Sequence, residues 1–236
     1  MATFVLVHGA MGGGWGWRRV APLLRARGHD VYTPTLTGLG EREHLATPAA
    51  NLTTHVTDIV NVLRYEDLHD IVLVGHSYGG MVITGVVEQE AERIKHLVYL
   101  DAMLPQAGQS AVDMTGQLPP GIEGWRVSVP GAGVAPPNET PEQAWGRTRL
   151  RPHPLATLQE ALPMSRALES RPFTRTYVKA TGAPRDPDNP GIFWLAADRV
   201  REDPAWRYHE LPCGHSMHRE MPNELVALLL ELTLQQ

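Results

Sequence analysis

The sequence predicts an α/β fold, a mostly parallel sheet of about six strands with helices on both faces. Short apolar or β-branched runs alternate along the chain with longer stretches whose apolar residues recur at helical spacing. With 42% hydrophobic and 20% charged residues, the 236-residue chain can also bury the core that such a layered fold needs. We therefore expect one domain over residues 1–236, interrupted by a single insertion.

The first strand-helix unit is predicted at the start of the sequence. Residues 3–7 form a run of β-branched and aromatic residues that ends at His8 and Gly9, which is typical of a buried strand leading into a tight turn. Residues 15–27 then carry apolar side chains at helical spacing and stop at Gly28. We expect one continuous helix there.

The same alternation continues to the end of the chain. Strands are expected over 30–33 and 71–74, separated by a helix with Val56, Ile59 and Leu63 on one face. The remaining expected elements are a glycine-rich helix over 79–90, a strand over 96–100, apolar segments over 175–179, 192–200 and 206–211, and a C-terminal helix over 224–234.

Residues 105–171 break this rhythm and are rich in proline, glycine and methionine. We interpret them as a lid inserted over the carboxyl ends of the strands, where ligands bind in parallel sheets. Its apolar side chains and those just before it are candidates for a pocket suited to a small ester, although each could equally be ordinary packing. They are Met103, Leu104, Met114, Trp125, Trp145 and Met164.

Composition excludes several classes of function. The net charge is −5 and no basic stripe is present, so nucleic acid is not expected as a partner. The apolar run over 4–7 stops far short of a signal peptide or membrane span, and Cys213 is the single cysteine. We expect a cytoplasmic protein that binds a small molecule, with no membrane partner and no cofactor; a homodimer is left open.

The motif that carries chemistry is Gly75-His76-Ser77-Tyr78-Gly79, which fits G-x-S-x-G and lies between an apolar strand and a helix-forming stretch. A sharp strand-to-helix turn would lift the serine hydroxyl above the sheet, and the flanking glycines admit the close backbone approach that this turn requires. A glycine-serine loop is the alternative, but the strand and helix on either side favour Ser77 as a nucleophile.

Acyl transfer also needs amide donors for the developing oxyanion. The motif predicts one donor at Tyr78, directly after the nucleophile, and one in an early strand-to-helix loop, here Ala10. The nearby glycines at 12–14 could instead belong to a phosphate-binding loop, but no G-x-x-x-x-G-K-[ST] pattern accompanies them. We therefore favour an oxyanion loop at this position.

Among eleven histidines, His215 is the candidate base because it follows the last expected strand, and this motif places its histidine last in the chain. His218 is the second candidate, and His209 lies within the strand. The spacing of His215 and His218 does not predict a metal site, because no H-E-x-x-H pattern exists and Cys213 is the only thiol.

Several of these motifs together resemble the plant methylesterase and hydroxynitrile lyase branch of the α/β-hydrolase superfamily and its bacterial esterase relatives. The resemblance covers most of residues 1–101 and 174–236, whereas the lid matches weakly. It implies the α/β-hydrolase fold and carboxylic ester hydrolysis. The residues that carry it are Phe4 to Ala10, Trp15, Trp17, Gly28 to Val31, Gly75 to Gly80, Gly214 and His215.

The triad acid has two candidates. The resembling family usually carries it after the strand that precedes the histidine strand, near residues 181–183, where this chain has no carboxylate. Asp186 lies a few residues later, beside Asp188. Asp101 ends the strand over 96–100, a position that some relatives use, the haloalkane dehalogenases among them. A partly buried aspartate there would need a partner such as an imidazole N–H, so Asp101 is preferred to Asp186.

These residues predict a serine hydrolase that cleaves carboxylic esters of small or medium-sized apolar substrates through an acyl-enzyme intermediate. A hydroxynitrile lyase is less favoured, because that family has a lysine after the catalytic histidine and a threonine at the position of Gly9, whereas this chain has Ser216 and glycine. A lactonase, thioesterase or cyclase that uses the same residues is also compatible with the sequence, as is a non-catalytic small-molecule receptor.

Overall fold

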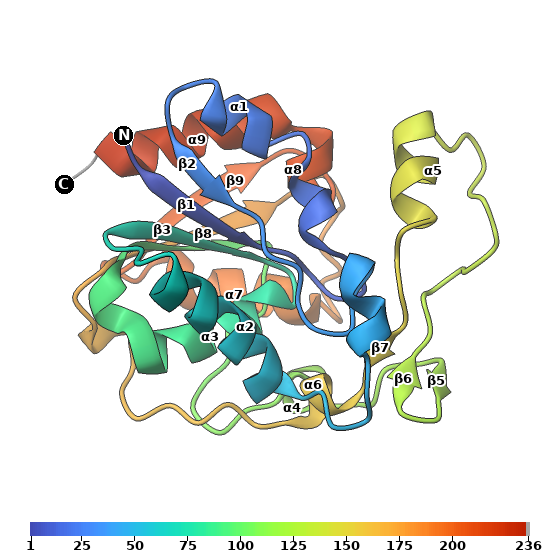
Figure 1. Cartoon of the computed structure of the whole chain (residues 1–236). Helices are drawn as coiled ribbons and strands as arrows, with labels where there is room; N and C mark the ends of the chain where they lie inside the picture. Colours follow the sequence, from blue (N-terminus) through green and yellow to red (C-terminus); the bar gives the residue numbers. More distant parts are fainter. Residues whose placement is uncertain (235–236) are drawn as a thin grey trace.

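A computed structural model describes residues 1–234 and contains the expected layered α/β architecture (Figure 1). Its main sheet has six strands in the order β2-β1-β3-β4-β8-β9, and every neighbouring pair is parallel. The predicted fold class is therefore confirmed. The strands are β1 (Thr3–Val7), β2 (Asp30–Tyr32), β3 (Ile71–His76), β4 (Ile94–Leu100), β8 (Thr174–Ala180) and β9 (Arg207–Leu211).

Helices cover both faces of this sheet, as Figure 1 shows. One face carries α2 (Leu52–Tyr65), α3 (Gly79–Glu90) and α7 (Gly191–Arg201). The other carries α1 (Ala21–Arg25), α8 (Met217–Glu220) and α9 (Pro222–Leu234). Among the described residues, no helix is long and apolar enough to cross a membrane.

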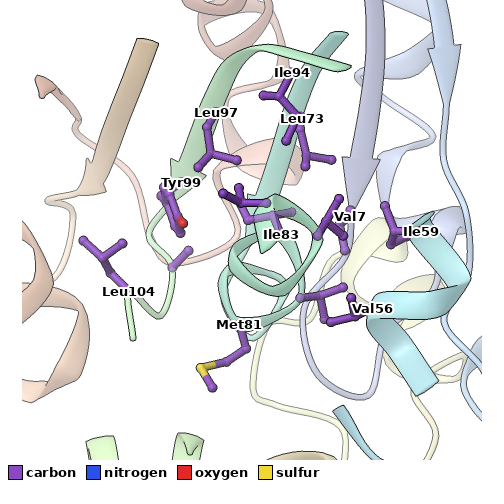
Figure 2. Close-up of a cluster of buried hydrophobic side chains, with 14 of the residues drawn as sticks. Val7, Val56, Ile59, Leu73, Met81, Ile83, Ile94, Leu97, Tyr99 and Leu104 are labelled. Atoms are coloured by element: carbon purple, nitrogen blue, oxygen red, sulfur yellow. The ribbon is translucent and has the colours of Figure 1, made fainter. Parts of the chain in front are cut away.

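The two apolar layers follow from the two-residue period of a strand. In β1, Val5 and Val7 join the layer under α2 and α3, whereas Phe4 and Leu6 join the layer under α1 and α9. Figure 2 shows the first layer, where Leu73 of β3 lies among side chains from both helices. Because both faces of β1 and β3 are buried, these two strands are apolar along nearly their whole length, which explains the continuous runs in the sequence.

The expected helix over 15–27 is wrong as a single element. The structure has a short 3-10 helix, η1 (Gly14–Trp17), then a turn, and then α1. Pro22 lies at the start of α1, where its fixed φ and missing N–H suit a first turn but interrupt a longer helix. The structure also fixes the type of the later apolar segments: 174–180 and 207–211 are strands, and 191–201 is a helix.

The segment 105–171 contains short elements rather than only loops. A small antiparallel sheet is formed by β5 (Ile122–Glu123), β6 (Arg126–Val127) and β7 (His153–Pro154). Figure 1 shows α5 lying outside the main layers. The segment also contains the helices α4 (Ala111–Thr115), α5 (Pro141–Arg147), α6 (Ala156–Gln159) and η4 (Leu168–Ser170), and the remaining 3-10 turns of the chain are η2 (Gly40–Leu45) and η3 (Ala91–Arg93).

Candidate active site

Ser77 lies in a sharp turn between β3 and α3. Its φ is +55°, in the left-handed region that non-glycine residues rarely adopt. Backbone hydrogen bonds hold this conformation: Ser77 N–H donates to Leu100 O at 3.3 Å, and Met103 N–H donates to Ser77 O at 3.0 Å. Strain of this kind persists only where the surroundings impose it, and it concentrates at functional sites. The turn therefore has the geometry expected of a nucleophile elbow.

Glycines allow the elbow to pack against the loop after β1. A Cβ atom on Gly9 would lie 2.9 Å from Ser77 Cβ and 3.1 Å from His76 Nδ1. A Cβ on Gly79 would lie 2.8 Å from Val7 O. Both contacts are too short for any side chain, so the glycines bring the end of β1 directly beside the serine. Ala10, the predicted oxyanion donor, follows Gly9 in this loop.

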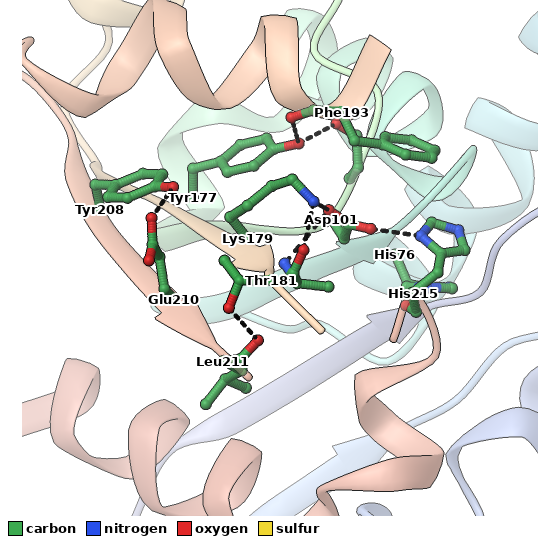
Figure 3. Close-up of polar contacts among 12 residues, drawn as sticks. His76, Asp101, Tyr177, Lys179, Thr181, Phe193, Tyr208, Glu210, Leu211 and His215 are labelled. Carbon is green, nitrogen blue, oxygen red and sulfur yellow. Dashed lines mark hydrogen bonds and ion pairs between the residues drawn. The ribbon is translucent and has the colours of Figure 1, made fainter. Parts of the chain in front are cut away.

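Asp101 and His215 are joined by a short hydrogen bond, with 2.6 Å between Asp101 Oδ2 and His215 Nδ1 (Figure 3). Asp101 follows β4 with φ +42°, and its N–H donates to Val178 O at 2.8 Å. Its side chain is 4% exposed, whereas that of His215 is 41% exposed. The carboxylate therefore holds the Nδ1 side of the ring from within the protein, which leaves Nε2 as the nitrogen able to accept a proton.

The charge on Asp101 is stabilised by its neighbours. Burial alone would raise the pKa of this carboxyl, but hydrogen bonds from His215 and Lys179 outweigh burial and keep the pKa below its ordinary value. Asp101 is therefore a carboxylate throughout the neutral pH range.

The second candidate acid is far less suited to that role. Asp186 is exposed, and its Oδ1 accepts hydrogen bonds from Asp188 N–H and Asn189 N–H within its own loop. At the family's usual position after β8, the backbone is pinned to the neighbouring strand end, because Gly182 N–H donates to Cys213 O at 2.7 Å. A Cβ on Gly182 would lie 2.5 Å from the Cys213 carbonyl carbon, so no carboxylate could be attached there.

The backbone of His215 is held by a histidine that directly precedes Ser77. His76 Nε2–H donates to His215 O at 2.8 Å, and the two rings lie 4.6 Å apart. Burial lowers the pKa of His76 to about 3, so this ring stays neutral. On the other side, Phe193 of α7 stacks on His215 at 4.6 Å. The sequence did not single out either neighbour.

His218, the second candidate base, contacts the His76 ring, with 4.6 Å between ring centroids, and makes no hydrogen bond to Asp101. It is buried against Trp17, with 4.8 Å between ring centroids, and burial lowers its pKa well below the ordinary value. His209 lies within β9. Of the three histidines considered from the sequence, His215 is the one that contacts Asp101.

Another buried histidine supports the loop after β1. His8 Nδ1–H donates to Gly9 O at 2.8 Å, and Leu36 N–H donates to His8 Nε2 at 3.0 Å. Because Nε2 accepts a hydrogen bond, the ring must be neutral, and burial lowers the pKa of His8 to about 4. In the sequence His8 marks only the end of a strand, since no local pattern distinguishes a supporting histidine from any other.

The Tyr78 side chain is anchored by a buried histidine of α2. Its hydroxyl donates to His55 Nδ1 at 3.0 Å, and His55 Nε2–H donates to Thr37 O at 2.9 Å. Burial lowers the pKa of His55, which agrees with the neutral ring that this pattern needs. The residue that precedes α3 is thus tied to α2 and to the loop after β2.

The expected pocket residues do not gather in one place. Trp145 packs edge-on against Trp15 and between Arg18 and Arg149. Leu104 and Met114 line a 240 Å³ cavity beside α7. Met164 instead borders a 440 Å³ cavity beside the end of α7 and a 680 Å³ cavity between α2 and α3 and the lid segment. Among residues 1–234, no group of three or more histidine, cysteine, aspartate or glutamate side chains could hold a metal ion.

Comparisons with known proteins show the family to which the chain is related. The model of the alpha/beta hydrolase family matches residues 4–228. The carbendazim hydrolyzing esterase of Nocardioides sp. (strain SG-4G) is 38% identical, over 98% of this chain and all of the relative. Salicylic acid-binding protein 2 of Nicotiana tabacum is 37% identical over 44% of this chain and 40% of its own. A solved extracellular alpha/beta-hydrolase from a Paenibacillus species has a TM-score of 0.79 and 26% identity, with 98% of each chain covered.

Proposed function

The chain belongs to the alpha/beta hydrolase family. We propose that it is a serine esterase with Ser77 as nucleophile, His215 as base and Asp101 as the acid that orients the base. The observation that carries the proposal is the 2.6 Å hydrogen bond between Asp101 and His215, formed beside an elbow whose serine has φ +55°. Acyl transfer by a serine uses this combination of a positioned imidazole and a nucleophilic hydroxyl.

The reaction follows from these roles. Ser77 Oγ attacks the ester carbonyl carbon while His215 Nε2 accepts the hydroxyl proton. His215 then donates that proton to the leaving alkoxide oxygen, which departs as the alcohol and leaves an acyl-serine. Water attacks the acyl carbon in the same way, with His215 again accepting and returning the proton, and the carboxylic acid is released. Asp101 stays ionised throughout and stabilises the transient imidazolium.

The oxyanion is proposed to bind the backbone N–H groups of Ala10 and Tyr78. The close approach of Gly9 to Ser77 supports this assignment, because it places the loop after β1 against the elbow. Removing one such donor costs about 3 to 4 kcal/mol of transition-state stabilisation in well-studied enzymes. The residues 105–171 are proposed as the lid that covers this site.

Substrates of small or medium size are proposed, since relatives include a carbendazim hydrolyzing esterase. A lactonase or thioesterase would use the same residues, so the choice among them is a matter of substrate testing. A cytoplasmic location is also proposed, supported by the single cysteine, and fractionation of the native host tests it.

The decisive experiment measures turnover of nitrophenyl esters of increasing acyl length, with carbendazim, a lactone and a thioester in the same panel. Wild-type protein should hydrolyse at least one ester, and Ser77→Ala should lose that activity. A fluorophosphonate probe should label Ser77, as mapped by mass spectrometry, and should not label Ser77→Ala. Labelling at another serine, or full turnover by folded Ser77→Ala, would contradict the proposal.

A further inference from the structure

Lys179 is a buried lysine beside the proposed catalytic acid. The chain has two lysines, and the other, Lys95, is exposed on β4. Lys179 lies in β8 and its side chain is 5% exposed. An ammonium group is costly to bury unless it is paired and hydrogen-bonded. The partners of Lys179 must therefore compensate for the loss of its hydration.

Three partners surround the ammonium group. Lys179 Nζ donates to Asp101 Oδ1 at 2.7 Å and to Ala180 O at 2.6 Å. It also lies 4.4 Å from the ring centroid of Trp194, a cation–π contact from α7. Figure 3 shows Lys179 reaching toward Asp101 from the side opposite His215. These contacts fix the position of the cation.

The two oxygens of Asp101 are therefore divided between two partners. Oδ2 accepts from His215 Nδ1, and Oδ1 accepts from Lys179, with Ala180 N–H at 3.4 Å. The carboxylate cannot rotate without breaking contacts on both oxygens. Its negative charge is also paired with the Lys179 ammonium group.

We infer that Lys179 is a positioning residue of the catalytic site, which holds the Asp101 carboxylate toward His215 and offsets part of the negative charge that the imidazole faces. The inference rests on the proposed function, because it concerns the same acid and base. A neighbouring cation disfavours a second positive charge, so its removal should let His215 hold its proton to higher pH.

Other ionisable groups near Asp101 and His215 are neutral in the range where this effect would appear. Burial lowers the pKa of His76, on β3, to about 3, and it lowers the pKa of His218 well below the ordinary value. Burial raises the pKa of Tyr177, beside Lys179 on β8, and raises that of Cys213 to about 11. His76, Tyr177 and Cys213 therefore stay neutral between about pH 5 and 8, and burial favours the neutral form of His218.

The more distant charges are engaged elsewhere. Arg185 lies 5.5 Å from the Trp194 ring centroid and pairs with Asp198 of α7 at 2.7 Å. Glu220 of α8 accepts a hydrogen bond from Gly214 N–H at 2.8 Å. Lys179 is thus the cation in direct contact with the proposed acid.

The test compares Lys179→Met with Lys95→Met, which removes the same charge at an exposed position. The pH dependence of kcat/KM is measured for both, and the midpoint of the His215 ring titration is followed by NMR in a Ser77→Ala background. The His215 signal is assigned by its loss in His215→Gln. Lys179→Met should move the acid limb and the midpoint upward by about one pH unit, and Lys95→Met should move neither.

A folded Lys179→Met protein with an unchanged limb and midpoint would overturn the inference. If Lys179→Met does not fold, the same comparison is made with Lys179→Gln, which carries no charge but can still donate a hydrogen bond to Asp101. A higher midpoint in Lys179→Gln supports the inference, and an unchanged midpoint overturns it. NMR needs no turnover, so a shifted midpoint in a protein without esterase activity would reject the proposed function and leave the positioning effect established.

Discussion

The backbone N–H of Met11 donates to Nδ1 of His153 at 3.2 Å, a contact between residues 142 positions apart in the chain. Met11 directly follows Ala10 and has φ +63°, a strained conformation for a methionine. Its carbonyl oxygen accepts from Arg151 N–H at 2.9 Å. Both backbone groups of Met11 are therefore held by residues 151–153 of the proposed lid, and this contact sets the shape of the proposed oxyanion loop.

We expect His153→Leu to lower kcat by about ten- to a hundredfold, because the loop loses the acceptor that holds its strained residue and the proposed oxyanion donor shifts. His153→Asn should recover part of the activity, since its amide oxygen can accept from Met11 N–H. Steady-state kinetics and thermal melting on both variants separate loop positioning from unfolding. Wild-type kcat in folded His153→Leu would show that the lid does not position the loop.

The choice of acid leads to a second prediction. Asp101→Asn should lower kcat by several orders of magnitude, up to about 10⁴ as in a well-studied protease, because an amide cannot stabilise the imidazolium. Asp186→Asn should cost little, because Asp186 only caps its own loop. Probe labelling and melting curves control for folding. A large loss in Asp186→Asn beside near-normal activity in Asp101→Asn would reverse the assignment.

The strained turn at Ser77 predicts a stability difference between two inactive variants. Glycine adopts positive φ without penalty, whereas alanine in the left-handed region costs about 1 to 2 kcal/mol. Ser77→Gly should therefore be more stable than Ser77→Ala by roughly 1 kcal/mol, after the greater flexibility of unfolded glycine is counted. Urea unfolding at pH 7.5 measures the difference. Equal stabilities would mean that the turn relaxes when the hydroxyl is removed.

Buried neutral histidines predict acid sensitivity. The pKa of His8 is lowered to about 4 and that of His76 to about 3, so the unfolded chain binds protons more readily than the folded one below about pH 6.5. Stability contributed by each ring is complete above that pH and decreases as the pH falls. Each of the two histidines should lower the free energy of unfolding by about 2 kcal/mol at pH 5 relative to neutral pH.

Urea unfolding at pH 7.5, 6 and 5 tests this expectation. His8→Asn should flatten the loss of stability between pH 6.5 and 5, whereas His44→Asn, at an exposed site, should leave it unchanged. The pKa of Asp101 is also lowered, but stability from that group is lost only below its ordinary value, near about pH 4. An unchanged slope in His8→Asn would show that His8 is not held neutral by the fold.

Much of the fold and part of the candidate site were predictable because the signals are local. Apolar runs and helical spacing predicted the first four strands and most helices of the main layers, whereas the types of the later apolar segments came from the structure. The motif and chain order predicted the family, which the comparisons confirm. Ser77 was recognisable because the strand, turn and helix that surround it are contiguous in sequence. The single helix expected over 15–27 was wrong because the effect of Pro22 outweighed the apolar spacing.

By itself, the sequence determined the layered α/β class and the expected elbow at Ser77, because each depends on spacing along neighbouring residues, and it determined His215 as candidate base from its order in the chain. The tertiary structure decided which acid meets His215, since both Asp101 and Asp186 fit the sequence until the loops are placed. It also brought Lys179 into contact with Asp101 and His153 into contact with Met11, across 78 and 142 positions. Such partners are brought together by the packing of the sheet and the lid segment, and no local pattern in the chain encodes that packing.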